Sequence, residues 1–364
     1  MFKKTLAAAA ILGAFAGSAF AADVTLYGVI DTGFNYTHVD QTGAADSDTF
    51  QMKSGQNSGP RFGLKGTEDL GNGLKVGFNL ENSFNSDDGT LDLSGRLFHR
   101  ESLLWVSGAF GEISFGRTGA LDAGTGRYGQ MGSAAHAFST GWDNIASTSL
   151  VFKGQGSRMD NTVTYQTPKF GGVSVLAQYS FKKDNVDAKT GAAVEGVEGE
   201  SSSNRYYAVG VKGDFGALSS ALVVSSNNVA SWGDNAKTGD DPLAVSARVS
   251  YDFGFIKPMI AAQYYDGDES ADLKGYGVTL GAIAPVFGAK LKASVGYGDY
   301  DTVQTTDKDS YTAYTFGLGY DYSLSKRTMV YTAAGYSEQK EEFKASADQK
   351  TKTTEVMLGL VHTF

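Results

Sequence analysis

The chain has 364 residues, of which 20% are charged, with a formal net charge of −9 and no cysteine. This acidic balance argues against nucleic acid as a partner, because phosphate binding needs clustered positive charge. The lack of cysteine excludes a disulfide framework as the source of stability. The glycines sit in turns and strands without a strand-to-helix phosphate loop, so the sequence predicts no cofactor.

The start of the chain has the pattern of a secretory signal. Lys3 and Lys4 give a positive start, an apolar run follows, and Ala19–Ala21 forms an A-x-A cleavage site. The apolar run is too short to cross a membrane as a helix. We therefore expect residues 1–21 to be removed and residues 22–364 to form one exported domain without a transmembrane helix.

Two kinds of connection alternate along the rest of the chain. The short kind is a tight turn, five times built on Phe-Gly, where glycine supplies the positive φ that a hairpin needs. The short turns are Asp69–Gly73, Ala109–Gly111, Lys169–Gly172, Asp214–Gly216, Asp252–Gly254, Val286–Gly288 and Ser323–Lys326. The long, polar connections are His38–Ser58, Asn85–Gly95, Thr118–Gly156, Lys182–Ser203, Ser226–Asp241, Asp266–Leu273, Asp299–Ser310 and Ser337–Lys350. Seven short and eight long connections predict 16 strands that run up and down through a slab, with both termini on the short-turn side.

Apolar and polar residues alternate between these connections, as in Leu243–Tyr251. The last strand places Val356, Leu358, Leu360 and the terminal Phe364 on one parity, hence on one face. A soluble β-sandwich could use such strands, but it would not need to end on a bare aromatic. We interpret the pattern as a closed antiparallel transmembrane β-barrel, with apolar side chains outward and a water-filled interior. The final strand then closes the barrel, and its aromatic end lies at the membrane interface.

The connection Thr118–Gly156 differs from the other long ones. It carries aromatic and apolar residues such as Tyr128, Phe138 and Trp142, and few acids. A solvated external loop would be more polar, and loops of this length are usually functional. We expect it to fold into the barrel and narrow the pore, the alternative being a surface loop that packs on itself.

Basic residues on the strands are the candidate lining of this narrowing. Arg61, Lys65 and Arg158 have the parity of inward groups, whereas the parity of Arg100 is ambiguous. Asp122 is the best candidate for an acid facing them from the loop. Converging charges in a narrow throat would set a field that sorts ions.

Six segments in order resemble the Gram-negative general porin family, of the trimeric type found in β-proteobacteria and neisserial relatives. They are Val24–Gly33, Arg61–Gly71, Arg100–Arg117, Arg158–Tyr165, Leu324–Thr328 and Gly359–Phe364. The resemblance implies a 16-stranded barrel with short periplasmic turns, long extracellular loops and a third loop folded into the lumen. It also implies a homotrimer in the outer membrane, in contact with lipid and lipopolysaccharide, and a basic cluster at Arg61, Arg100 and Arg158.

The expected function is passive diffusion of small hydrophilic solutes and ions. The loop is poor in acids, so we expect a mild preference for anions. A substrate-specific channel and a barrel adhesin are the alternatives. Catalysis is not expected, because none of the four histidines lies in a recognisable Ser-His-acid context. The acidic run Asp266–Asp272 is better explained as a solvated loop than as a metal site.

Overall fold

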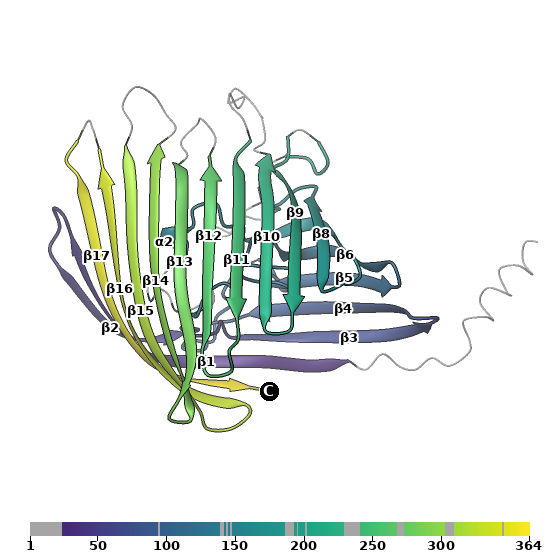
Figure 1. Ribbon diagram of the computed structural model, residues 1–364, viewed down its shortest axis with the longest axis horizontal. Coiled ribbons are helices and arrows are strands. Elements are labelled where there is room, and N and C mark those ends of the chain that lie inside the picture. The colour runs from purple at the N-terminus through teal and green to yellow at the C-terminus, as the bar shows by residue number, and fades with distance from the viewer. Residues whose placement is uncertain are drawn as a thin grey trace, which may run out of the picture.

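The computed structural model describes residues 24–93, 95–138, 142, 145, 148–185, 193–194, 196–200, 202–228, 241–267, 273–302, 309–343 and 346–364. In this part of the chain one antiparallel sheet of 17 strands closes on itself (Figure 1). The predicted signal, residues 1–21, lies outside it. The strands are β1 (Thr25–Gln41), β2 (Ser47–Ser54), β3 (Arg61–Gly71), β4 (Leu74–Ser83), β5 (Glu101–Gly108), β6 (Gly111–Gly119), β7 (Arg158–Gln166), β8 (Val173–Ser180), β9 (Arg205–Phe215), β10 (Leu218–Asn228), β11 (Leu243–Tyr251), β12 (Lys257–Asp266), β13 (Leu273–Val286), β14 (Ala289–Thr302), β15 (Ser310–Ser323), β16 (Thr328–Glu342) and β17 (Gln349–Thr363).

Setting β2 aside leaves the 16 barrel strands that the sequence predicts. The first part of β1, Thr25–Val29, pairs with β3, and its later part, Thr32–Val39, pairs with β2. β2 thus pairs with the same edge of β1 as β3 does, but further along β1, beyond the end of β3. The long polar connection predicted at His38–Ser58 does join β1 to β3, and within it the chain continues the backbone ladder as a hairpin of β1 and β2.

The barrel closes between β1 and β17, whose register runs from Val29 opposite Thr363 to Gln41 opposite Thr351. The backbone N–H groups of Gly28 and Phe364 each donate to the carbonyl of the other, both at 3.0 Å. Because of this ladder the sheet has no open edge. An open edge would leave backbone groups without hydrogen bonds in lipid.

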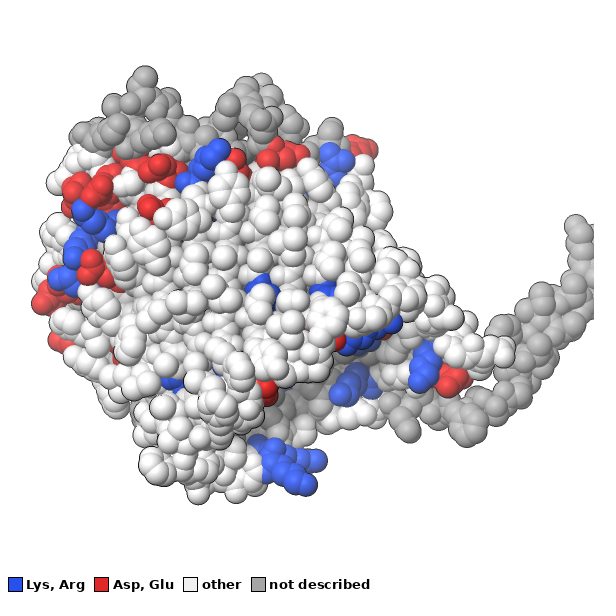
Figure 2. Space-filling model, viewed as in Figure 1, with Lys and Arg blue, Asp and Glu red and all other residues white. Residues whose placement is uncertain are grey.

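The two faces of the wall differ as the alternation predicts. Outward side chains are apolar and exposed, including Val356, Leu358 and Leu360 beside Phe364 on the closing strand. Figure 2 shows charged side chains gathered along the upper rim, beside the long connections, with few across the middle of the face. Inward positions carry small polar residues instead, and the buried ones include Ser246, Thr279, Ser294, Thr315 and Ser337. An apolar belt with a polar interior is the arrangement of a membrane barrel.

The short turns are tight hairpins at one end of the barrel. Between β13 and β14 only Phe287 and Gly288 are unpaired, with φ angles of 51° and 78°. The Phe287 ring is 92% exposed at this end, where an interfacial aromatic belongs. Except for His38–Ser58, each predicted long connection includes residues outside the described part, as does the acidic run Asp266–Asp272.

The connection between β6 and β7 runs inside the barrel, so the prediction of an inward third loop is confirmed. Its beginning, with Leu121 and Tyr128, packs on the inner wall of β5 and β7–β10. Further along, Phe138, Trp142 and Ile145 pack against inward residues of β1, β12, β16 and β17. The loop therefore reaches from one wall of the lumen to the opposite one. It contains the short helix α2 (Thr148–Val151), and no helix in the described part is long and apolar enough to span a membrane.

Polar wall side chains hold the loop by its backbone. Gln178 donates to the Gly119 carbonyl and accepts from the Leu121 N–H, both at 3.1 Å. Tyr300 donates to the Val151 carbonyl at 2.7 Å. Buried backbone groups need such partners, so the wall fixes the loop as secondary structure would.

Glycines inside the strands give the loop room. A Cβ atom at Gly335 on β16 would lie 2.8 Å from Ile145 Cα, and one at Gly319 on β15 would lie 2.8 Å from the Phe138 ring. Glycine in a strand interior weakens the strand and often marks a close approach of another segment. The glycine content of these strands therefore serves the inward loop as well as the turns.

Candidate functional site in the barrel lumen

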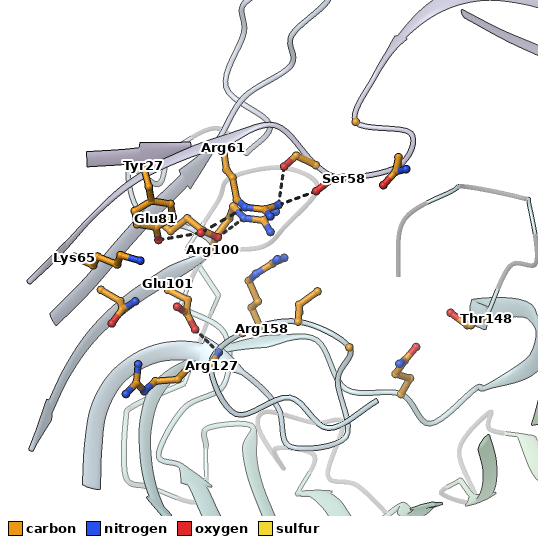
Figure 3. Close-up of a pocket in the computed structure, with 18 of the residues that line it drawn as sticks. Tyr27, Ser58, Arg61, Lys65, Glu81, Arg100, Glu101, Arg127, Thr148 and Arg158 are labelled. Atoms are coloured by element: carbon orange, nitrogen blue, oxygen red, sulfur yellow. Dashed lines mark hydrogen bonds and ion pairs between the residues drawn. The ribbon is translucent and has the colours of Figure 1, made fainter. Parts of the chain in front are cut away.

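A cavity of about 880 Å³ lies between the inner wall and the third loop. We call it the basic cavity. The wall supplies residues from β1, β3, β4 and β5, the loop supplies residues 124–127, 148–149 and 155, and Arg158 begins β7. Figure 3 shows Arg61, Arg100 and Arg158 reaching into this space from separate segments. The four basic residues that the sequence singles out, Arg61, Lys65, Arg100 and Arg158, all line it.

Two of these arginines share one carboxylate. Glu81 Oε1 lies 2.6 Å from Arg100 Nε, and Glu81 Oε2 lies 3.7 Å from Arg61 Nε. Arg61 also donates to the Gly59 carbonyl at 2.9 Å. The Tyr27 hydroxyl donates to Glu81 at 3.0 Å. Glu81 therefore accepts two hydrogen bonds and forms one longer ion pair, and it holds two guanidinium groups near the wall.

The loop side has a second network. Glu101 accepts from the backbone N–H of Arg127 at 2.6 Å and from the Thr118 hydroxyl at 3.0 Å. The Arg127 guanidinium forms two hydrogen bonds to Glu112, at 2.7 and 2.8 Å, and lies 4.7 Å from the Trp105 ring centroid. The Glu112 carboxylate holds the pKa of Arg127 above its ordinary value, against the effect of burial. Arg127 is thus a fixed cation in the loop.

Lys65 and Arg158 have no carboxylate partner in the described part of the chain. The Lys65 ammonium lies 5.1 Å from the centre of the Tyr27 ring. The Arg158 Nε is buried without a hydrogen bond. Both residues line the basic cavity, and neither is committed to a carboxylate.

Asp122 lies elsewhere. It is 1% exposed and does not line the basic cavity. Its carboxylate accepts from the Tyr206 hydroxyl at 3.0 Å and the Ser225 hydroxyl at 2.5 Å, both on the wall. Burial raises the pKa of the Asp122 carboxyl above its ordinary value. The side chain ties the start of the loop to β9 and β10 and does not face the basic residues, because the loop turns it into the wall.

Sequence reasoning missed Glu81, Glu101 and Arg127 as site residues. Glu81 was detectable, because it shares the inward parity of Asn79 on β4. Arg127 was not, since nothing in a loop sequence predicts which side chains face the lumen. Among the described residues, no group of three or more His, Cys, Asp or Glu is placed to hold a metal.

The arrangement can bind and orient ions. Five basic side chains, Arg61, Lys65, Arg100, Arg127 and Arg158, line the cavity with two acidic ones, Glu81 and Glu101. Fixed cations in a narrow throat favour anions there.

Comparison with known proteins gives a consistent result. The model of the Gram-negative porin family matches residues 7–342. The chain is 33% identical to an outer membrane porin protein of Bordetella pertussis and 32% identical to the outer membrane porin protein 32 of Delftia acidovorans, in both cases over the full length of both chains.

The solved structure of an anion-selective porin from Comamonas acidovorans superimposes with a TM-score of 0.67 at 28% identity. That match covers 94% of this chain and all of the other. With the closed barrel, the inward third loop and the family match over nearly its whole length, the chain belongs to the Gram-negative porin family.

Proposed function

We propose that this outer-membrane channel passes small anions in mild preference to cations. The protein itself forms a water-filled path for passive diffusion of small hydrophilic solutes, as its family and fold indicate. The observation that carries the preference is the lining of the basic cavity, where five basic side chains outnumber two acidic ones. The anion selectivity of the Comamonas porin supports the proposal.

The fine composition of the lining explains why the preference should be mild. Glu81 offsets part of the charge of Arg61 and Arg100, and Glu112 does so for Arg127. The uncompensated charge then resides chiefly on Lys65 and Arg158. A wet lumen screens these charges, so each shifts ion partition by a small factor.

The test is the zero-current potential of the refolded protein in a planar bilayer under a KCl gradient. We expect a potential directed toward chloride, which shrinks as salt is raised. A potential directed toward potassium at every salt concentration would contradict the proposal. A folded barrel without conductance would instead indicate a plugged channel.

We further propose a homotrimer whose contact includes the outward face of β1 and β2. Phe50 is 72% exposed there and stacks on Phe34 at a ring distance of 5.8 Å, with Met52 nearby on β2. The rest of the outer face would meet membrane lipid, and its rim lipopolysaccharide. Chemical cross-linking of the protein in membranes should give a trimer that Phe50→Glu disrupts, whereas a monomer in the wild type would contradict this assembly.

A further inference from the structure

A second cavity, of about 650 Å³, lies on the short-turn side of the third loop. We call it the lysine cavity, after Lys257, Lys290 and Lys292 in its lining. It shares Asn57 and Ser58 with the basic cavity. A solute that leaves the basic cavity toward the short turns therefore meets this second space next.

Two of the three lysines are uncommitted. Lys257 at the start of β12 and Lys290 on β14 form no ion pair in the described part of the chain. Lys292 is engaged, since its ammonium lies 2.5 Å from Asp321 and 4.7 Å from the centre of the Trp142 ring. Asp321 is thus occupied by Lys292 and does not cancel the other two charges.

The other acid in the lining, Asp252, lies in the turn before β12. One of its oxygens accepts the Gly254 N–H at 2.8 Å. Three lysines against two aspartates leave the cavity weakly basic, with the free cations at Lys257 and Lys290.

One wall of the same cavity is apolar. Ile283 and Pro285 on β13 line it, with Ala137 and Trp142 from the loop. Trp142 is held edge-on between Phe138 and Tyr331, at 5.2 Å from each ring centre. An apolar wall beside two free ammonium groups differs from the basic cavity, whose lining is polar and rich in arginine. Such a mixture recognises a carboxylate that carries an apolar body.

We propose that the lysine cavity binds small organic carboxylates with an apolar body. The carboxylate lies against Lys257 and Lys290, and the body lies on Ile283 and Pro285. Inorganic anions lack the body and gain only the charge. This inference rests on the channel function, because solutes reach the cavity through the lumen, but it does not depend on the chloride preference.

The experiment measures block of the KCl current by benzoate, with acetate and benzylammonium as comparison probes, on the full refolded protein. We expect saturable block by benzoate at a lower half-block concentration than by acetate, and none by benzylammonium. The double variant Lys257→Gln with Lys290→Gln should raise the benzoate half-block concentration about tenfold, because it removes both charge-assisted contacts. If that variant folds poorly, Lys290→Gln alone, at an exposed side chain, should raise it severalfold.

The matched control is Lys212→Gln. Lys212 on β9 is also inward and lies near the short turns, but it does not line the lysine cavity. Its removal should leave the half-block concentration unchanged.

Two outcomes would overturn the inference. One is equal block of the wild type by benzoate and acetate. The other is a half-block concentration that rises in Arg158→Gln but not in the lysine variants, which would place the binding at the basic cavity. The zero-current potential in KCl, measured on the same channels, reports separately on the proposed chloride preference.

Discussion

Arg158 differs from Arg61 and Arg100 in lacking a carboxylate partner in the described part of the chain. Replacing it with glutamine removes a charge that forms no ion pair among the described residues. Two unit charges about 7 Å apart in water interact by about 0.6 kcal/mol, so anion partition should fall roughly threefold. We expect the chloride-to-potassium permeability ratio to fall by at least that factor in Arg158→Gln, because potassium partition rises as chloride partition falls.

Arg327→Gln is the matched control for that variant. It makes the same change in net charge at an exposed residue of the last short turn. The zero-current potential should not move in the control, and Arg158→Lys should retain most of the preference. Equal shifts in both glutamine variants would mean that total charge, and not the basic cavity, sets the selectivity.

Asp122 offers a second test at the same scale, because its buried contacts make it an anchor of the loop. Asp122→Asn keeps a group that can bond Tyr206 and Ser225, and should leave the permeability ratio unchanged. Asp122→Leu removes the acceptor that both hydroxyls use, at a cost of about 1–3 kcal/mol for a hydrogen-bonding group left unpaired, and should loosen the loop. Single-channel recording should then show a larger and noisier conductance. If the permeability ratio of Asp122→Asn shifted clearly toward anions, the Asp122 carboxylate would have to contribute to the pore lining.

These residues show which parts of the site could be predicted from the sequence. Arg61, Lys65 and Arg158 lie on strands, where the period of two assigns each side chain to a face, and they do line the cavity. Asp122 and Arg127 lie on the third loop, which has no such period. Their directions depend on how the loop meets the wall, through contacts such as those of Gln178. Strand residues were therefore predictable and loop residues were not.

The same difference appears at the scale of elements. The short and long connections predict the strand count, whereas the alternation of apolar and polar residues marks the strands and ends where the wall leaves the apolar belt. β1, β14 and β16 continue into stretches that the sequence assigned to loops, and β2 lies wholly in one. Beyond the apolar belt both faces of the wall are in contact with water. A strand there needs no apolar face and is held by its backbone hydrogen bonds alone. The alternation therefore predicts strands that are too short.

The strand glycines beneath the third loop give a prediction for an element. Gly335→Ala places a Cβ 2.8 Å from Ile145 Cα, which a backbone atom cannot easily avoid. We expect the loop to shift from the wall and the single-channel conductance to change by tens of per cent. Gly210→Ala, on an inward position of β9, meets nothing closer than 3.4 Å and should behave as wild type. Unchanged conductance in Gly335→Ala, with a folded barrel, would show that the loop is not seated on β16.

The stability of the whole molecule depends on contact between lipid and the apolar side chains on the outer face of the barrel. Leu280 lies at the middle of β13, is 51% exposed, and has Ile260 and Val295 as its neighbours on the adjacent strands. Leu280→Arg should lower the free energy of unfolding by about 2–4 kcal/mol, because a charge at the bilayer midplane must leave water. The matched change Leu243→Arg, at the long-connection end of β11, should cost only about 0–1 kcal/mol near the interface.

Urea unfolding in lipid vesicles, followed by tryptophan fluorescence, measures both variants. Equal losses would mean that depth does not matter, and the outer belt would then be a surface for protein contacts and not for lipid. A large loss of unfolding free energy in Leu280→Arg alone would show that the apolar face predicted by the alternation lies in the membrane. A soluble sheet would have no reason to penalise the middle of an exposed strand more than its end.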